Sequence, residues 1–233
     1  MNTDKTWHDC TVINLENKPD GYRFLRLKTP VGWQHKPGQY TIFNLKDSEG
    51  TFKAYYSIAS DIDHSGEIDF CIHTSPESRS GKIYDHLQPG DTLPVAPAQG
   101  NFELQESTKP KIFIAGGSGI APIRAMVQRE LQKSQSNQAV HLIYGCRSGN
   151  HIPYANDFKS LSSAHDRFSF TFCAETTDNN EYVKKGMVTD FLTTAIIENC
   201  EYYLCGPKPM LEAVVAILET ANVAETDIYM EKY

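Results

Sequence analysis

The sequence predicts two domains of different fold class, a β-barrel or β-sandwich followed by an α/β domain with a parallel sheet. Three observations support this prediction. The chain has 233 residues, which suffices for two domains of about 100 residues each. Short strand-like runs fill the first part of the chain. In the second part, strand-like and helix-like segments alternate.

Between residues 11 and 104, short apolar or alternating runs are separated by segments rich in Gly, Pro, Asn and Asp. Such separators favour turns, and several short strands at this spacing are typical of a barrel or a sandwich. One brief helix is expected near residues 80–87. The predicted strands are CTVINL, YRFLRLKTP, QYTIFNL, AYYSIAS, EIDFCIHT, DTLPVAP and NFEL.

After residue 110 the pattern changes to alternating strands and helices. Residues 111–117 read as a buried strand, and residues 121–133 carry apolar side chains near helical spacing. The alternation continues to the C-terminus, which implies a parallel sheet covered by helices on both faces. The predicted domains are therefore residues 1–106 and 107–233. The later segments, strands and helices in alternation, are AVHLIYG, ANDFKSLSSA, FSFTFCAE, MVTDFLTTAIIE, YYLCG, PMLEAVVAILETA and DIYMEKY.

The composition excludes several functional classes. The net charge is −7, so the broad positive surface of a nucleic-acid-binding protein is not expected. No apolar run approaches the roughly 18 residues of a membrane span, and the N-terminus lacks a signal-peptide core, so we expect a cytoplasmic protein. The six cysteines form no Cys-x-x-Cys pair and no zinc or iron–sulfur spacing, so no metal site is predicted.

The stretch IAGGSGIAP, residues 114–122, is the sharpest functional motif. A buried strand ends at Gly116, Gly117 and Gly119, and Pro122 falls in the first turn of a helix. Glycines let the backbone approach a ligand closely, and a helix N-terminus offers free N–H groups to a pyrophosphate. The spacing differs from the dinucleotide fingerprint G-x-G-x-x-G. The motif indicates phosphate binding, with a tight strand–helix turn as the alternative.

A second motif, YYLCGPKPM at residues 202–210, also ends a strand and starts a helix. Ligands of open α/β sheets collect at the carboxyl ends of the strands, so Cys205 lies at the end that can touch a substrate. The alternative interpretation is a buried cysteine before a Gly-Pro stop.

Together with HKPGQY at residues 35–40, these motifs resemble those of the ferredoxin–NADP⁺ reductase superfamily. The chain follows the superfamily order over nearly its whole length, at residues 37–40, 56–57, 97–102, 116–122, 144–147, 205–210 and 231–233. The resemblance implies a flavin-binding antiparallel β-barrel of six strands, followed by an NAD(P)-binding α/β domain. It also implies a stand-alone reductase without an iron–sulfur domain.

The resemblance further implies a role for each site residue. Tyr56 lies against the isoalloxazine ring, and Ser57 hydrogen-bonds near its N5. Cys205 lies beside the nicotinamide, and Glu231 matches the C-terminal acid of the superfamily, so Ser57, Cys205 and Glu231 are the expected catalytic residues. Tyr233 covers the other ring face, with a frayed terminus as the alternative. The other expected cofactor-binding residues are Tyr40, His73, Arg79, Ser80, Gly81, Gly116, Gly117, Gly119, Ile120, Pro122, Arg147, Gly206, Pro207 and Met210.

The chain departs from the superfamily pattern at the flavin phosphate. The arginine of Arg-x-Tyr-Ser, which pairs with that phosphate, is replaced by Ala54. Lys53 is adjacent, but neighbouring strand residues face opposite sides unless a bulge intervenes. We therefore expect Arg79, or in second place Lys82, to supply the positive charge from the loop before the short helix. The alternative is that Arg79 is a solvated loop charge.

The expected cofactors are FAD, with FMN as the alternative, and NADH in preference to NADPH. Glu175 and Asp178 lie at or just after the end of the strand at residues 168–175. There they would repel a 2′-phosphate and could accept a hydrogen bond from a ribose hydroxyl. Arg147 favours the opposite preference.

Three functions are compatible with these residues. The first is a flavin-dependent oxidoreductase that moves a hydride from NAD(P)H to flavin N5 and passes electrons to a separate acceptor, such as a ferredoxin or an oxygenase component. The second is an NAD(P)H:flavin reductase that uses flavin as a substrate, and the third is a non-catalytic subunit of the same fold. An acidic acceptor would need a basic patch, for which Arg23, Arg26 and Lys28 are candidates, with a solvated barrel face as the alternative.

Overall fold

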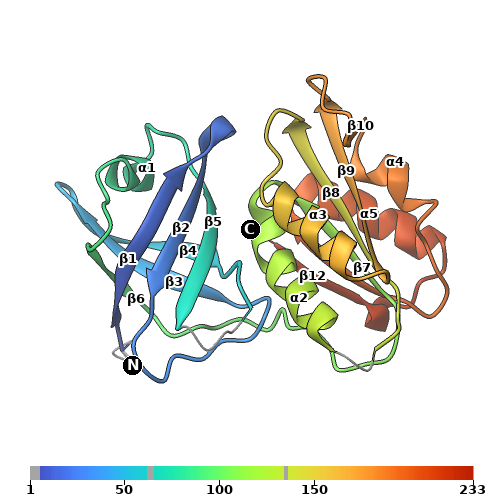
Figure 1. Ribbon diagram of the computed structural model, residues 1–233, viewed down its shortest axis with the longest axis horizontal. Helices are drawn as coiled ribbons and strands as arrows, with labels where there is room; N and C mark the ends of the chain where they lie inside the picture. The colour runs from blue at the N-terminus through green and yellow to red at the C-terminus, as the bar shows by residue number, and fades with distance from the viewer. Residues whose placement is uncertain (1–5, 62–65, 134–135, 233) are drawn as a thin grey trace. The chain divides into compact units, whose positions relative to one another are not determined.

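The computed structural model describes residues 6–61, 66–133 and 136–232. The chain divides into two compact units, one made of residues 1–104 with 124–126 and the other of residues 105–123 and 127–233. Within the described ranges, each unit is built on one six-stranded sheet (Figure 1).

The sheet of the first unit is antiparallel and curls upon itself, which confirms the predicted barrel class (Figure 1). Its order is β4-β3-β6-β1-β2-β5, and an isolated bridge between Ile58 and Phe70 brings its two edges together. The curl encloses a core that contains the fully buried Phe43 and Leu27. The strands are β1 (His8–Asn17), β2 (Tyr22–Lys28), β3 (Tyr40–Asp47), β4 (Gly50–Ser57), β5 (Glu67–His73) and β6 (Thr92–Val95).

Two short helical segments connect these strands. A 3₁₀ turn, η1 (Pro19–Gly21), joins β1 to β2, and α1 (Arg79–Tyr84) lies between β5 and β6. The Ser78 side chain caps α1 by accepting a hydrogen bond from the Gly81 N–H group at 3.0 Å. The helix packs on the barrel core through the fully buried Tyr84.

The predicted strand at residues 101–104 does not form. In this segment Phe102 is buried, whereas Asn101 is exposed. The Phe102 carbonyl lies so close to Gly38 that a Cβ atom at Gly38 would overlap it. The segment is therefore held by the buried Phe102 side chain, and it does not form a strand.

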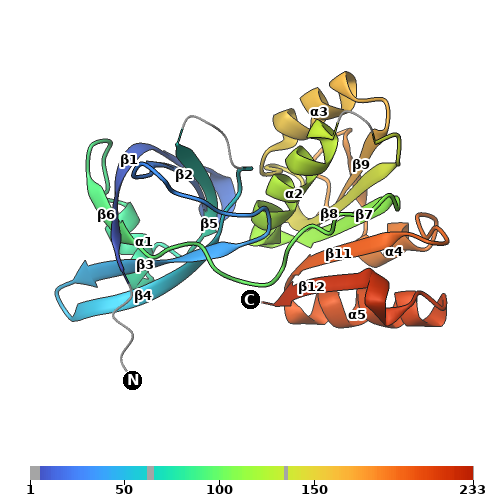
Figure 2. The same cartoon turned by 90° about the horizontal axis from the view of Figure 1, so that it is seen from below.

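The sheet of the second unit is parallel throughout, with the order β10-β9-β8-β7-β11-β12. Helices α2 and α3 cover one face and α4 and α5 the other, as predicted for an α/β domain (Figure 2). The strands are β7 (Lys111–Gly116), β8 (Val140–Ser148), β9 (Phe168–Thr176), β10 (Val183–Lys185), β11 (Glu201–Gly206) and β12 (Ile228–Lys232). The helical segments are η2 (Gly117–Gly119), α2 (Ile120–Gln132), α3 (Ala155–Ala164), α4 (Val188–Leu192), α5 (Lys208–Thr220) and η3 (Glu225–Asp227).

Two elements of this unit differ from the prediction. The helix expected over residues 187–198 ends at Leu192, after which the chain turns and the side chains become largely exposed. The edge strand β10 has only three residues, and of these only Val183 is buried, so it carries too little alternation to be recognised from the sequence.

Candidate cofactor-binding sites

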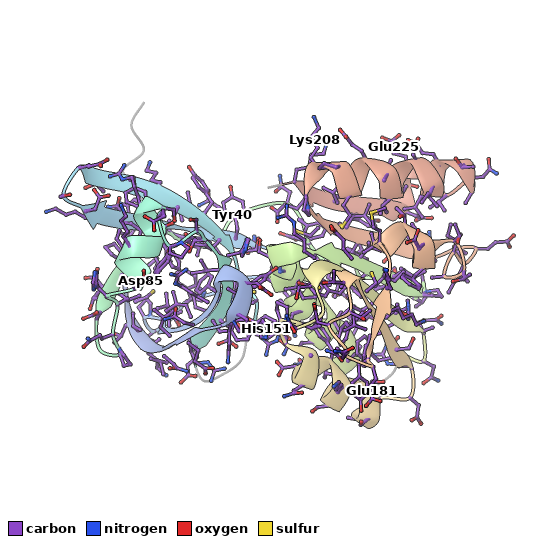
Figure 3. All side chains as sticks on the ribbon, turned by 90° about the horizontal axis from the view of Figure 1, so that it is seen from above. Tyr40, Asp85, His151, Glu181, Lys208 and Glu225 are labelled. Carbon is purple, nitrogen blue, oxygen red and sulfur yellow. The ribbon has the colours of Figure 1, made fainter. Side chains whose placement is uncertain are left out.

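The glycine-rich loop after β7 packs directly against the end of β11. These strands are parallel neighbours, with Ala115 opposite Cys205, so the two motifs meet at the carboxyl ends of the strands. A Cβ atom at Gly119 would overlap the Cys205 carbonyl, and one at Gly206 would lie 2.5 Å from Met210 Cε. Glycine is therefore required at position 119, where the overlapping atom belongs to the backbone, whereas at position 206 the flexible Met210 side chain could move aside. Lys208, labelled in Figure 3, begins α5 immediately after it.

The same loop leads into α2. Gly117 has a positive φ of 57°, which favours glycine, and the residues from Gly117 to Gly119 form a 3₁₀ turn before Ile120 begins the thirteen-residue helix. The first N–H groups of a helix lack intrahelical partners, and Pro122 in the first turn removes none of the helical hydrogen bonds. The arrangement fits a pyrophosphate, which prefers the positive end of the helix dipole.

Cys205 and Glu231 are paired residues of the adjacent parallel strands β11 and β12. Burial raises the pKa of the Cys205 thiol, so this group is neutral at physiological pH and does not act as a thiolate. Burial also raises the pKa of Glu231 to about 7. Its Oε2 atom has no hydrogen-bond partner within the part of the chain that the structure describes. A neutral thiol therefore lies beside a carboxyl group that can hold or release a proton near neutral pH.

A fixed negative charge lies at the carboxyl ends of β8 and β9. Asp178 accepts hydrogen bonds from the Ser148 hydroxyl at 2.8 Å, the Thr176 hydroxyl at 3.0 Å and the Gly149 N–H group at 3.1 Å. These bonds, those from the two hydroxyls first, lower the pKa of Asp178, so it is ionised. Ser148 was not singled out from the sequence, because a hydroxyl at the end of a strand has no distinguishing pattern.

Arg147 and Glu175 are exposed near the same edge, in β8 and β9. The residues that bear on nucleotide preference therefore gather at adjacent strand ends.

In the barrel, four predicted flavin-binding residues form two pairs at the end of β4, Ser57 with Tyr40 and Tyr56 with Ser80. Ser57 is paired with Tyr40, which begins β3 and is labelled in Figure 3. The Tyr56 ring packs on Phe43 with a centroid separation of 5.1 Å, and its hydroxyl lies close to the Ser80 hydroxyl. A fixed aromatic ring beside the Ser80 hydroxyl, with Ser57 and Tyr40 paired at the strand end, suits a flat, polar-edged ring such as isoalloxazine.

The ladder between β3 and β4 is regular from the Tyr40–Ser57 pair to the Asp47–Gly50 pair, so it contains no bulge. Lys53 is exposed, and because side chains alternate along the strand it lies on the face opposite Ala54. It cannot take the place of the superfamily arginine without a change of strand register.

Arg79 is held in an ion pair. Its guanidinium donates to both carboxylate oxygens of Asp47, at 2.6 and 2.7 Å, and lies over the Phe52 ring. Asp47 was not singled out from the sequence, because acids are common in hairpin turns such as DSEG. The Arg79 hydrogen bonds, the largest influence, lower the pKa of Asp47 to about 2, so the pair is charged.

Three further predicted flavin-site residues do not lie with the flavin-binding residues at the end of β4. The His73 ring packs against Tyr22, and its Nε2 atom lies 3.0 Å from the Asp20 carbonyl, at the connection between β1 and β2. Gly81 is buried, and a Cβ atom there would overlap the Ser75 carbonyl, which gives this glycine a role in the fold of α1. Tyr233 lies outside the described residues.

Arg23 does not belong to an exposed basic patch on β2, so the prediction is wrong for this residue. This side chain is 5% exposed and donates to Asp85 at 2.6 Å and to the Thr74 hydroxyl at 2.6 Å. It points into the barrel because it shares an inward face with Leu25 and Leu27. Arg26 remains half-exposed and pairs with Asp69 on β5 at 2.7 Å.

Neither a metal centre nor a membrane span is found in residues 6–61, 66–133 and 136–232. Within these ranges no three His, Cys, Asp or Glu side chains gather closely enough to hold a metal ion. The helices in the same ranges are too short or too polar to cross a membrane.

Comparison with protein families matches each unit separately. Residues 10–104 match the oxidoreductase FAD-binding domain, and residues 113–216 match the oxidoreductase NAD-binding domain. The two matched families account for the two cofactors that the motifs predict.

Two curated relatives are components of oxygenase systems. Over 236 residues the chain is 30% identical to the toluate 1,2-dioxygenase electron transfer component of Pseudomonas putida, covering 99% of this chain and 69% of that protein. Over 213 residues it is 29% identical to the reductase component of propane 2-monooxygenase from Rhodococcus jostii, covering 88% of this chain and 57% of that protein. The chain thus spans only part of the length of these relatives.

Among solved structures, the fold matches a ferredoxin NADP⁺ reductase from Neisseria gonorrhoeae determined with bound FAD and NADP. The TM-score is 0.82 at 17% sequence identity, covering 97% of this chain and 98% of that one. This likeness establishes the fold.

Proposed function

Because the chain belongs to the FAD- and NAD-binding oxidoreductases of the ferredoxin–NADP⁺ reductase superfamily, we propose that it passes electrons from NAD(P)H through a flavin to a separate acceptor. The observation that supports this most is the contact between the glycine-rich loop and Cys205 at adjacent strand ends. The relatives named above serve an oxygenase, so the proposed acceptor is an oxygenase component or a ferredoxin.

In this proposal each unit holds one cofactor. Tyr40, Tyr56, Ser57 and Ser80 bind the flavin, and the loop that leads into α2 binds the nicotinamide cofactor through its pyrophosphate. Bound flavin supplies the chemistry, because it accepts a hydride from the nicotinamide and releases electrons one or two at a time.

The protein contributes positioning and the control of protons. Tyr56 offers a ring surface already fixed by Phe43, which reduces the entropy lost on binding. The Cys205 side chain at the strand end is fully buried and uncharged, so it offers no competing nucleophile beside the proposed nicotinamide position. Glu231 holds a proton below about pH 7 and releases it above, so it can accompany proton uptake and release at this site.

We further propose a preference for NADH. The ionised Asp178 would repel a 2′-phosphate, whereas a ribose hydroxyl could donate to a nearby carboxylate such as Glu175. Comparison of kcat/KM for the two cofactors tests this preference. A higher value for NADPH would refute it.

The test of the main proposal is the visible spectrum of the purified protein, combined with NADH oxidation in the presence and absence of added FAD or FMN. Flavin peaks that survive desalting, with electron delivery to a ferredoxin, support the proposal. A colourless protein that oxidises NADH only with added flavin supports the second candidate, an NAD(P)H:flavin reductase, which the loss of the phosphate-binding arginine at Ala54 favours. A colourless protein that remains inactive with either flavin would refute both and favour a non-catalytic subunit.

A further inference from the structure

Arg79 and Ser80, the first two residues of α1, flank the position of Ala54. Phe52, Ala54 and Tyr56 share one face of β4, because side chains alternate along a strand. The Arg79 guanidinium lies over the Phe52 ring, 4.1 Å from its centroid, and the Ser80 hydroxyl lies close to that of Tyr56. The alanine that replaces the superfamily arginine is therefore bordered by a cation and a hydroxyl from the same helical turn.

Arg79 already has an anionic partner. Its Nε and Nη2 atoms donate to the two oxygens of Asp47, and Nη2 also donates to the Gly50 carbonyl at 3.3 Å. The Glu49 carboxylate lies 3.6 Å from Nε. A phosphate that approaches Arg79 thus meets one cation and two carboxylates, so binding requires a change of partner.

Resting on the proposed function, we propose that Arg79 is the cation that binds the flavin phosphate and that Asp47 is the counter-ion that the phosphate displaces. Two phosphate oxygens present the same forked acceptor to a guanidinium as a carboxylate does, so one can replace the other. The Arg79 side chain is 41% exposed, so the exchange takes place at the solvent boundary. The competition with Asp47 lowers the affinity for the flavin phosphate and makes flavin affinity depend on the charge at position 47.

Equilibrium dialysis of the full 233-residue chain against FMN, FAD and riboflavin tests this inference. Riboflavin has the same ring without a phosphate. Arg79→Ala should weaken FMN and FAD binding by on the order of 10- to 100-fold, the effect of losing hydrogen bonds to a charged group, and should leave riboflavin binding unchanged. Asp47→Asn should strengthen FMN and FAD binding about fivefold, because it removes a competing charge near the phosphate, again without an effect on riboflavin.

Two lysines provide matched controls. Lys53→Ala removes a charge from the opposite face of β4, and Lys82→Ala removes one from the same helix as Arg79. Both variants should bind FMN as the parent does. Unchanged riboflavin binding by every variant also shows that the ring site has folded.

Several results would overturn the inference. These are FMN binding by Arg79→Ala equal to that of the parent, an equal loss of riboflavin and FMN binding in that variant, or weaker FMN binding caused by Lys82→Ala instead. An Asp47→Asn variant that binds FMN no more tightly than the parent would refute the displacement. Failure of the parent to bind any of the three flavins would refute the proposed function itself, and the two failures are thus distinguishable.

Discussion

A buried charge cluster at the amino ends of β7 and β11 allows a quantitative stability prediction. The Lys111 side chain is 1% exposed, and its Nζ atom lies 3.4 Å from Glu201 Oε2 and 3.7 Å from Glu130 Oε2. It also donates to the Ser107 hydroxyl at 3.2 Å. Glu201 accepts a further hydrogen bond from the Tyr203 hydroxyl at 2.9 Å. One lysine thus faces two buried carboxylates.

The substitution Lys111→Met keeps most of the aliphatic volume and removes the charge. Removing one partner of a buried ion pair costs about 3–5 kcal/mol when the other partner stays buried without a cation. Here that partner is Glu201, because Glu130 keeps Lys133 at 3.0 Å and Arg167 at 3.8 Å. For a unit of this size, that loss corresponds to a decrease of roughly 10–20 °C in Tm. Lys109→Met is the matched control, because this neighbouring lysine pairs with Asp227 where both side chains are partly exposed, so its ion pair contributes less than the buried one.

The two units can be followed separately in one thermal denaturation experiment. The chain has two tryptophans, Trp7 and Trp33, and both belong to the barrel unit, so tryptophan fluorescence reports on that unit. Helical circular dichroism reports mainly on the α/β unit, which contains the longer helices. Lys111→Met should lower the circular dichroism midpoint and leave the fluorescence midpoint in place. Equal circular dichroism midpoints for Lys111→Met and Lys109→Met would refute the reasoning.

Three further predictions concern the cofactor sites. Gly119→Ala should greatly weaken NADH binding without affecting flavin binding, because the added Cβ atom would overlap the Cys205 carbonyl. An unchanged NADH affinity in a nucleotide titration would contradict the proposal that the glycine-rich loop binds the pyrophosphate. Burial raises the folded-state pKa of Glu231 to about 7 from its ordinary 4.5, so the stability that this group confers is complete below pH 4.5 and is lost as the pH rises through 7. Glu231→Gln should therefore match the parent at pH 4.5 and be more stable above pH 7, as measured by urea denaturation; parallel pH profiles would exclude this. Ala54→Arg should tighten FMN binding about tenfold and make it less dependent on Arg79, as dialysis of the single and double variants would show, whereas an unchanged affinity would place the phosphate elsewhere.

Much of the fold could be predicted from local patterns. The segment ANDFKSLSSA coincides with α3, and KIFIAGG and YYLCG coincide with β7 and β11 to within one residue at each end. In these segments hydrophobic periodicity and the flanking glycines agree with the tertiary fold. The pattern failed where it was short or one-sided, as in β10 and in the helix that ends at Leu192.

The sequence by itself determined the order of the two sheets, the class of each, and the motifs that indicate flavin and nicotinamide binding. These properties depend on the spacing of residues along the chain, which can be read directly. Only the tertiary structure decided that the Gly119 loop contacts Cys205, since that contact depends on β7 and β11 being neighbours.

The partners of the charged side chains were likewise decided by the tertiary structure. Arg23 and Arg79 are similar as sequence features, yet one is buried against Asp85 and the other is paired with Asp47 near the surface. The reason is physical: a strand pattern indicates which residues share a face, but the partner of a charge is set by which distant segment folds onto that face.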